Sequence, residues 1–592
     1  MRVWCFAGRL AEPTFRIRTR LSRNAHRIPA QARETSVIIL GITDTVCQDN
    51  AAAMIVDGEL IGMVEEERLN RIKHAPRMVP QKAIQWCLDM ARCKLEDVDI
   101  IAIGFDHPNT VFLDNMLNKA QRYIRRRPVL RNPREEYQYW KRHRYYLAQL
   151  NPFLKERNKV MFVRHHMAHA ASSFFLSPFE EANIVSLDGS GGQDAGLMGV
   201  GRDTEIDVVR YVDRESSWGE FYERFTGALG FKPHSDEGKV MGLAAYGDPQ
   251  GKVFPFIRMP DSNDLPYFDR DGFLKTLAEI RPRARNENPI NGYHEQIAAR
   301  LQYSLEQVVG RMTQILHGKT GFTDLCMAGG TALNCSCNGK LLTLPHVKRI
   351  FVQPAAADCG TALGAAVYAY VKLTGKRPKT KFNHLYWGPE FSNEEIEGVL
   401  KQAKVPYRRV DHLGAETAKL LCENKIVGWF QGRMEVGPRA LGGRSILANP
   451  TDARMKDAVN NNVKFRESWR PFAPSILAEH MEEYFGTTHP SPFMILAFQA
   501  REEVKPRIPA ALHVDGTGRP QTVEKETNPR YYDLISEFKK LTGVPVVLNT
   551  SFNVAGQPIV CNPKDALGTF YICGLDALAI GDFIVEKGTR SM

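Results

Sequence analysis

Two similar strand-turn-strand segments constrain the fold of this chain more than any other feature of its sequence. The first begins at Val37 and reads VIILGI, TDTVCQDN, AAAMIVDG and, after the turn at Asp57-Gly58, ELIGMVEEER. The second begins at Asn183 and reads NIVSLDGSGGQDAGLMGVGR. In both, apolar strand-like runs alternate with turns of small and acidic residues. The repetition predicts a duplicated α/β fold in which each half offers a Gly-rich turn to a shared cleft, although two ordinary hairpins would give the same pattern.

A second domain is predicted from the length of the chain and from a change in its composition. At 592 residues the chain exceeds what one hydrophobic core usually serves. The charged stretch Thr374 to Lys381, TGKRPKTK, has no hydrophobic period and is our predicted linker, with a solvated loop inside one domain as the alternative. Ser392 to Glu395 then fits a capping box that opens a helix. We therefore predict an extension over 1–35, a first domain over 36–375 and a second domain over 376–592.

Charge and cysteine usage exclude several classes of protein. The net charge is +11, but the excess lies in residues 1–35 and 122–144, so the basicity is local and a nucleic-acid partner is not expected. No apolar run reaches about 18 residues, which excludes a membrane-spanning helix. The 11 cysteines include no C-x-x-C pair, so we expect reduced thiols in a cytoplasm.

The first 35 residues are rich in arginine and poor in acidic residues. They lack the apolar segment of a secretory signal. An organellar presequence and an over-long start assignment both stay open. In either case we expect the fold to begin after this extension.

Three histidines within five residues predict a metal site. The strand-like VMFV, residues 160–163, leads into an Ala-rich, helix-friendly segment that contains His165, His166 and His169. His165 and His169 are four residues apart and project from the same helical face, which is the spacing that a divalent ion requires of two imidazoles. Such pairs also occur where helices pack, so carboxylates are needed to complete the prediction.

Two aspartates are the candidates for the rest of the coordination shell. Asp188 and Asp358 each follow an apolar strand and lie in a turn of small residues, where strand ends deliver ligands to a cleft. Two imidazoles and two carboxylates with open positions favour Fe(II) or another first-row divalent ion over calcium. His166, which lies beside these residues, is our candidate proton acceptor.

Gly-rich segments supply candidates for nucleotide binding. Gly329 and Gly330 follow the apolar DLCM and precede Asn334. A glycine pair between strand and helix lets the backbone approach a phosphate or adenosine closely, and close helix packing is the alternative. Lys239, within SDEGKVMG, lies among glycines. It is a candidate for phosphate binding, or else a solvated turn lysine.

Arginines in rigid turns predict an anion-binding site in the last third of the chain. The stretch 428–445, GWFQGRMEVGPRALGGRS, places Arg433, Arg439 and Arg444 among glycines and a proline. Such arginines suit bidentate contacts with polyanions better than solvated ion pairs. Further cations and the polar end of VPVVLNTSFN extend the set to Lys464, Arg519 and Asn549. A strand-end turn that satisfies its own backbone is the alternative for VPVVLNTSFN.

Eight ordered blocks of this sequence resemble the O-carbamoyltransferases of antibiotic and nodulation-factor biosynthesis. They are DNAAAMIVDG with EEERLNRIKHA, HHMAHAASSFF, SLDGSGG, EGKVMGLAAYG, AGGTALNC, PAAADCGTALGAA, GRMEVGPRALGGRSILA and VVLNTSFN. The resemblance covers roughly Val37 to Lys587. It implies an actin-like (ASKHA-type) first domain, similar to the threonylcarbamoyl transferases of tRNA modification, followed by a YrdC-like α/β domain.

The resemblance also implies a reaction in two steps. The second domain would convert carbamoyl phosphate and ATP, accompanied by Mg²⁺, to carbamoyl-adenylate. The first domain would then transfer the carbamoyl group to a hydroxyl of a small-molecule acceptor near a bound metal, usually iron. Because carbamoyl-adenylate would be lost to water, we expect an internal passage between the two sites.

Individual residues take roles from this resemblance. The metal ligands would be His165, His169, Asp188 and Asp358. The activation site would involve Arg433, Arg439, Arg444, Lys464, Arg519 and Asn549. The catalytic set would be Asp49, Lys239 and His166, beside the cofactor-binding Gly329, Gly330 and Asn334. One position departs from the family pattern, because this chain has Gln48-Asp49 where the family usually has His-Asp, and this puts acceptor choice or rate in doubt.

Two other functions stay open from the sequence. A carbamoyl-transfer factor of tRNA modification would use Arg122 to Arg144, with its interleaved aromatic residues, as an RNA face, although a solvated pair of amphipathic helices is the plainer account. An actin-like sugar kinase would leave the arginines of the last third without a use. Acceptor pockets are formed by loops without fixed motifs, so toxin, antibiotic sugar and oligosaccharide acceptors stay open, as does a homodimer.

Overall fold

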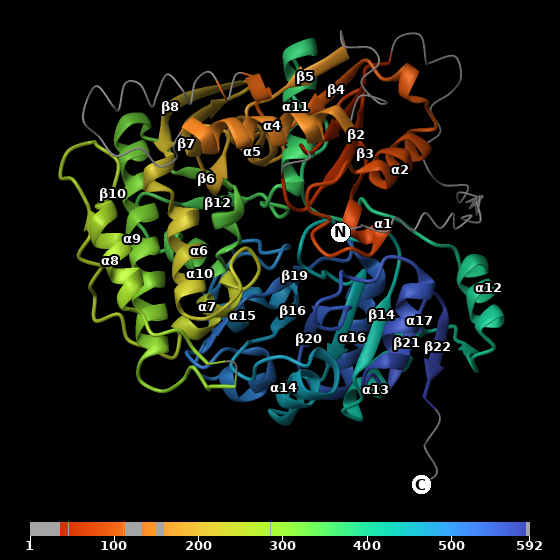
Figure 1. Cartoon of the computed structure of the whole chain (residues 1–592). Coiled ribbons are helices and arrows are strands. Elements are labelled where there is room, and N and C mark those ends of the chain that lie inside the picture. Colours follow the sequence, from red (N-terminus) through yellow and green to blue (C-terminus); the bar gives the residue numbers. More distant parts are fainter. Residues whose placement is uncertain are drawn as a thin grey trace, which may run out of the picture. The chain divides into compact units, whose positions relative to one another are not determined.

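The computed structural model describes residues 36–44, 47–109, 112, 133–149, 159–284 and 286–587. Contacts group Val37–Met592 into one compact unit, and its described residues form three large sheets (Figure 1). The predicted extension, 1–35, lies outside the described residues. The domain boundary at residue 375 stays a prediction.

The first sheet is built from the first predicted hairpin segment. Its strands pair in the order β3, β2, β1, β4, β5, with β1 antiparallel to β2 and parallel to β4. The central strands β1 and β2 are buried along their whole length, as expected of strands covered on both faces. The five strands are β1 (Ile38–Ile42), β2 (Ala51–Val56), β3 (Glu59–Glu65), β4 (Ile100–Ile103) and β5 (Val160–Phe162).

The second sheet repeats the topology of the first. Its order is β8, β7, β6, β11, β12, and its first strand, β6, again pairs antiparallel with the second and parallel with the fourth. The same strand order and directions in two successive sheets confirm the duplication predicted from the two hairpin segments. The five strands are β6 (Glu181–Gly191), β7 (Asp194–Arg202), β8 (Glu205–Asp213), β11 (Asp324–Ala328) and β12 (Arg349–Val352).

Two helices join these sheets. Helix α5 (His165–Phe174) contacts strands of the second sheet, α11 (Cys359–Thr374) contacts strands of the first, and the two helices pack against each other (Figure 1). A Cβ at Gly364 would lie 1.8 Å from the carbonyl oxygen of Ala168, so only glycine permits this approach. The backbones of α5 and α11 are therefore in direct contact.

The remaining helices of the first two-thirds cover these sheets and their connections. Helix α2 packs on β2 and β3, α6 packs on β6, and α7 packs on the long helix α9. These helices are α1 (Glu66–Asn70), α2 (Gln81–Ala91), α4 (Pro133–Gln149), α6 (Trp218–Ala228), α7 (Glu237–Ala244), α8 (Arg270–Glu279), α9 (His294–Thr320) and α10 (Cys335–Leu341). A short ribbon of β9 (Ile257–Arg258) and β10 (Tyr267–Phe268) completes the region.

The last third forms an eight-stranded sheet that is covered on both faces. Val427 and Trp429 belong to one buried cluster, and Phe430 belongs to another. Because successive side chains of a strand point to opposite faces, each face has its own core. The strands, in sheet order, are β13 (Arg408–Arg409), β22 (Phe583–Glu586), β21 (Ala577–Ile580), β14 (Val427–Phe430), β15 (Arg444–Ala448), β20 (Val546–Ser551), β16 (Ala473–Leu477) and β19 (Gln521–Val523).

Six helices accompany this sheet. They are α12 (Asn393–Ala403), α13 (Leu413–Cys422), α14 (Arg454–Val459), α15 (Met481–Phe485), α16 (Pro529–Thr542) and α17 (Pro563–Ile572), beside a ribbon of β17 (Phe498–Gln499) and β18 (Thr517–Gly518). Helix α12 begins at the predicted capping box, in which Ser392 accepts from the backbone of Glu395 and the Glu395 side chain accepts from Ser392. That prediction is confirmed.

The predicted linker is packed against the first two-thirds of the chain. The Arg377 guanidinium lies 4.7 Å from the ring centroid of Phe174 and donates to the Phe174 carbonyl oxygen at 3.0 Å. The Lys379 backbone N–H donates to the carbonyl oxygen of Gly58 at 2.8 Å. The Lys379 side chain is 61% exposed, so the segment is a partly solvated loop that these two residues anchor to the first two-thirds of the chain.

The basic stretch 122–144 lies mostly outside the described residues, and only its end, within α4, is described. All ten described cysteines are free thiols, as predicted. Within the described part of the chain, no helix is both long and apolar enough to cross a lipid bilayer.

The contact between α5 and α11 generates a stability prediction. Gly364→Ala should lower the free energy of unfolding by roughly 1–3 kcal/mol, because the new methyl group forces the two helix backbones apart. The matched control is Gly398→Ala on α12, where a Cβ meets nothing within 4 Å and should raise stability by about 0.5–1 kcal/mol. Thermal unfolding of both variants checks this. Equal melting temperatures for the two variants would contradict the packing argument.

Candidate active site

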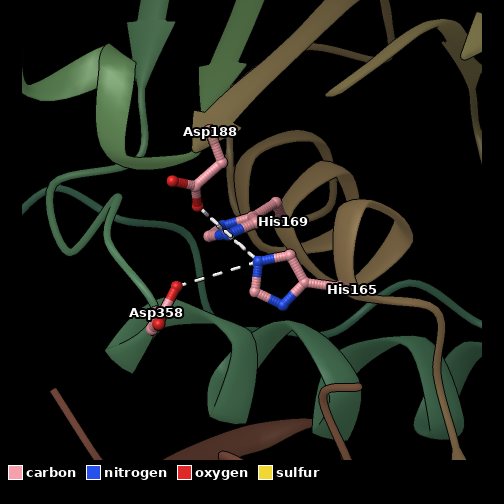
Figure 2. Close-up of side chains that lie close together, drawn as sticks. All are labelled: His165, His169, Asp188 and Asp358. Carbon is pink, nitrogen blue, oxygen red and sulfur yellow. Dashed lines mark hydrogen bonds and ion pairs between the residues drawn. The ribbon is translucent and has the colours of Figure 1, made fainter. Parts of the chain in front are cut away.

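Four predicted metal ligands lie together. His165 and His169, one turn apart on α5, direct their Nε2 atoms to the carboxylate of Asp188 on β6, at 3.6 and 3.2 Å (Figure 2). Asp358, at the start of α11, lies 3.7 Å from His165 Nε2. One ligand atom from each of the four residues lies within 4.8 Å of all the others. The geometry brings together the set that the sequence singled out.

The chemistry of these donors fits a divalent cation. Burial raises the pKa of Asp188, but hydrogen bonds from His165 and His169 outweigh burial and hold that pKa well below its usual range. Burial and the charge of Asp188 raise the pKa of Asp358 to about 7. Two partly buried carboxylates that repel each other would both be stabilised by a cation between them. Two imidazole nitrogens beside them suit a first-row metal.

Backbone groups hold the two carboxylates in place. The backbone N–H of Gln48 donates to Asp358 Oδ2 at 3.0 Å, and that of Gly189 donates to Asp188 Oδ1 at 2.7 Å. A Cβ at Gly191 would lie 2.0 Å from the His165 ring, so the turn after Asp188 can approach the histidine only as glycine. Such contacts orient ligands before a metal arrives.

His166 does not belong to the same surface. Its Nε2 lies 3.0 Å from the carbonyl oxygen of Asp194, and it is buried away from the cavity described below. Burial and the two neighbouring histidines lower the pKa of His166 to about 3. The prediction that His166 accepts a proton is therefore wrong for this position. Successive side chains on a helix point roughly 100° apart, so His166 cannot share the face of His165 and His169.

One cavity of about 1370 Å³ extends over residues from both ends of the chain. Its wall includes Asp188 and Asp358 from the four-residue cluster. It also includes residues of the last third, which are Gly437, Pro438, Arg439, Arg470, Ser551, Asn553 and Ile559. Of the predicted nucleotide residues, Gly330 and Asn334 line it. The predicted clefts of the two regions are therefore one continuous space.

A group of partly buried arginines lies at this space, where Arg439 and Arg470 line the wall and Arg466 and Arg519 lie beside them. Burial and the neighbouring charge of Arg519 lower the pKa of Arg439 to about 9. Burial, Arg470 and Arg519 together lower the pKa of Arg466 well below its usual value. The buried Nε atoms of Arg439 and Arg519 have no hydrogen-bond partner among the described residues. Positive charge that is buried without matching carboxylates is the state that an anionic ligand would relieve.

Lys464 and Asn549 hydrogen-bond to the loops that form this region. Lys464 Nζ donates at 2.8 Å to the Asn553 carbonyl oxygen and to Asn553 Oδ1, and at 2.8 Å to the Ser551 carbonyl oxygen. Asn549 Nδ2 donates to the Ala440 carbonyl oxygen at 3.1 Å, next to Arg439. Neither side chain lines the cavity. They hold the loops that carry Ser551, Asn553 and Arg439.

Arg433 and Arg444 contact backbone rather than the cavity. The fully buried Arg444 stacks on the ring of Phe430 and donates to the carbonyl oxygens of Gln431 and Pro389. Arg433 donates to the carbonyl oxygen of Trp387 at 2.6 Å. The prediction that these two arginines bind a ligand is therefore corrected: both stabilise the fold. Sequence spacing alone does not reveal which guanidinium groups already donate to backbone carbonyl oxygens.

Lys239 is also engaged elsewhere. Its Nζ lies 2.8 Å from Glu467 and 3.1 Å from Asp236, and it does not line the cavity. Its contact with Glu467 connects α7 to the arginine region. Phosphate binding by Lys239 is therefore not supported by its position, since two carboxylates already neutralise it.

Helix α1 ties the two regions together. The Arg68 guanidinium donates to the carbonyl oxygen of Gly437 at 2.9 Å, and the Glu65 carboxylate accepts from the Gly437 backbone N–H at 2.5 Å. Arg71 donates to the carbonyl oxygen of Ile559 at 2.6 Å. All three side chains come from the block EEERLNR. They position the turn that carries Arg439.

Two cavity-lining residues, Lys73 and His74 in RIKHA, were not predicted as site residues. Arg470, which belongs to the predicted arginine-rich region in KFRESWRPFAP, also lines the cavity, whereas Arg466 does not. Charged and imidazole side chains between apolar residues were the available signal. Only the fold shows that these two segments, far apart in the sequence, meet the same cavity.

Solved structures show weak similarity. HypF in a phosphate- and nucleotide-bound form is 13% identical, with a TM-score of 0.37, over 57% of this chain and 56% of that chain. The ROK hexokinase from Thermus thermophilus is 14% identical, with a TM-score of 0.32, over 57% of this chain and 100% of that chain.

Named relatives are more similar in sequence. Nodulation protein NolNO of Sinorhizobium fredii is 38% identical over 564 residues, which are 93% of this chain and 81% of that protein. The 3'-hydroxymethylcephem-O-carbamoyltransferase of Streptomyces clavuligerus is 30% identical over 443 residues, or 73% of this chain and 81% of that enzyme. Family models described as "Carbamoyltransferase N-terminus" and "Carbamoyltransferase C-terminus" match residues 38–367 and 418–587. The resemblance predicted from the sequence blocks is thereby confirmed, and the chain belongs to the carbamoyltransferase family.

Proposed function

We propose that this chain transfers a carbamoyl group from carbamoyl phosphate to a hydroxyl of a small molecule and consumes ATP to form carbamoyl-adenylate on the way. The observation that carries the proposal is the single cavity, whose wall has Asp188 and Asp358 in one part and Arg439 and Arg470 in another. A donor set for a cation and a donor set for anions face the same space. Two half-reactions that share an unstable intermediate need such a space, since it limits escape to water.

The activation step takes place at the arginine region. Carbamoyl phosphate and ATP, which is accompanied by Mg²⁺, are both highly anionic, and preorganised cations in a desolvated cleft stabilise the charge that develops as they react. Arg439 and Arg470 would contact these anions directly, and Arg466 and Arg519 would contribute charge from beside them. We assign this step to a YrdC-like second domain over 376–592.

The transfer step takes place at the four-residue cluster, in an actin-like first domain over 36–375. Fe(II), or another first-row divalent ion, would be held by His165, His169, Asp188 and Asp358. When bound, it would polarise the carbonyl of the carbamoyl group. Gly330 and Asn334, which line the cavity near this cluster, would contact the adenylate. A Cβ at Gly330 would lie 3.0 Å from Asp188 Oδ1, so glycine keeps this wall open.

The acceptor is proposed to be a small hydroxylated molecule. One relative is named for carbamoyl transfer to a hydroxymethylcephem. The cavity is large enough for a ligand of drug size beside the adenylate. Mass spectrometry across a panel of hydroxylated metabolites, with carbamoyl phosphate and ATP supplied, would identify the acceptor by the mass gain of one carbamoyl group.

The division of labour can be tested with two variants. Arg439→Ala should lower ATP–pyrophosphate exchange that depends on carbamoyl phosphate by about 100-fold or more, because one preorganised cation is lost from the developing charge. His165→Ala should keep exchange close to the wild-type rate and abolish formation of the carbamoylated acceptor. Radiolabelled pyrophosphate measures exchange, and mass spectrometry measures transfer.

A matched arginine provides the control for that experiment. Arg454 lies on the surface with its guanidinium paired to Asp452, so Arg454→Ala should leave both activities unchanged. If His165→Ala removes exchange and transfer equally, the assignment of the two steps to separate regions is wrong.

The metal assignment has its own test. Asp188→Asn should weaken Fe(II) binding by more than about 10-fold, because an amide replaces the carboxylate that both imidazoles face. Anaerobic titration followed by elemental analysis measures retained metal. Asp264→Asn, at an exposed aspartate, is the control and should bind metal as the wild type does. Equal metal retention by both variants would rule out this site.

A further inference from the structure

Two cavity-lining residues form a pair that the proposed function does not yet use. His74 Nδ1 lies 2.7 Å from Asp49 Oδ1, and the Asp49 backbone N–H donates to the His74 carbonyl oxygen at 2.8 Å. Both side chains are 29% exposed, and both line the cavity. The pair is therefore tightly organised yet open to a ligand.

The chemistry of the pair determines which nitrogen of His74 is basic. An ionised carboxylate only accepts hydrogen bonds, so the imidazole proton lies on Nδ1, facing Asp49. The other nitrogen, Nε2, then keeps its lone pair. Among the described residues, no hydrogen-bond partner is found for His74 Nε2. This is the arrangement in which a carboxylate orients a histidine as a proton acceptor.

The pair lies directly beside the metal-type cluster, which is the set of His165, His169, Asp188 and Asp358. Gln48, the residue before Asp49, donates its backbone N–H to Asp358 Oδ2 at 3.0 Å. The His74 backbone N–H donates to Glu67 Oε2 at 2.5 Å, and this hydrogen bond holds the loop after α1 that carries His74. Asp49 and His74 both have left-handed backbone conformations, with φ of 57° and 65°. Such conformations are costly for non-glycine residues and are retained where surrounding contacts hold them.

A second metal site is the competing interpretation of this geometry. Asp49, Glu67 and His74 have ligand atoms within 4.8 Å of one another. However, Arg68 Nη1 already lies 2.6 Å from Glu67 Oε1, and Lys73 adds positive charge beside Asp49 and Glu67. A cation would have to overcome this positive charge, whereas a proton shared along the Asp49–His74 hydrogen bond does not.

We propose that His74, oriented by Asp49, accepts the proton of the acceptor hydroxyl during carbamoyl transfer, an inference that rests on the proposed function. As the hydroxyl proton moves to His74 Nε2, the hydroxyl oxygen forms a bond to the carbamoyl carbon. The bond from that carbon to the phosphate oxygen of AMP breaks, and its electron pair leaves with AMP. The imidazolium then releases its proton to solvent.

This assignment also gives the substitution at Gln48 a physical meaning. An amide side chain cannot take up a proton at neutral pH, so Gln48 cannot serve as a base. Two histidines line the described part of the cavity wall, His74 and His234. His234 pairs with Glu223 at 3.0 Å, and its side chain is 58% exposed. Of these two, only His74 is hydrogen-bonded to Asp49. Asp49 directly follows Gln48, whose backbone N–H donates to Asp358.

The test uses the full-length, Fe(II)-loaded protein and variants His74→Gln, Asp49→Asn and His480→Gln. Carbamoyl phosphate and ATP are supplied with water alone or with glycerol as a surrogate acceptor, and AMP release, pyrophosphate exchange and metal content are measured. His74→Gln should lower AMP release by about 100-fold or more and leave exchange and metal content unchanged. Asp49→Asn should lower AMP release in the same direction. His480, which pairs with Glu483 outside the cavity, is the matched histidine control.

Chemical rescue separates proton transfer from a structural role. In His74→Ala, added imidazole should restore part of the AMP release, because it can occupy the space of the missing ring. Wild-type AMP release by His74→Gln, loss of exchange and metal together with AMP release, or absence of rescue would each overturn the inference. If the wild-type protein shows no exchange dependent on carbamoyl phosphate, or exchanges without releasing AMP, the proposed function fails first and the inference falls with it.

Discussion

Helices α5 and α11 touch along their backbones because Gly364 leaves no side chain between α11 and the carbonyl oxygen of Ala168. The first residue of α5 is His165, and Asp358 directly precedes α11. Close packing of the two helices therefore places an imidazole and a carboxylate from opposite halves of the duplicated fold at one point. The position of Asp188 follows from the same contact, since α5 also packs on β6. Any change that separates the helices would disperse the four ligands.

Charge is distributed unequally along the cavity that begins at this point. Carboxylates and imidazoles gather at α5, β6 and α11, whereas arginines gather in the turns of the last third. Burial makes both groups costly without a ligand, and each group fits a ligand of the opposite sign. A metal ion in one part and phosphate groups in the other would remove both costs. The cavity is thus best described as two incomplete sites that share one space.

Few residues connect the metal-type cluster with the arginine-rich turns of the last third. Glu65 and Arg68 on either side of the start of α1 both bond to Gly437, two residues before Arg439. The loop after α1 carries His74, which bonds to Asp49 beside the metal-type cluster. One short segment, EEERLNRIKHA, therefore contacts both parts of the cavity. This explains in physical terms how the orientation of the two regions is maintained within the compact unit.

The sequence by itself determined those features that depend on local pattern. The two hairpin segments predicted the duplicated topology, because apolar runs and turn residues specify strands and their connections. The i, i+4 histidines and the aspartates after apolar strands predicted the four-residue cluster for the same reason. Tertiary structure alone decided which of several chemically similar side chains face the cavity. Arg444 and Arg439 lie in one Gly-rich stretch, yet Arg444 is saturated by backbone carbonyls and Arg439 is not. Likewise His74 lines the cavity and His166 does not, because exposure and hydrogen-bond partners are set by segments distant in sequence, which local spacing does not encode.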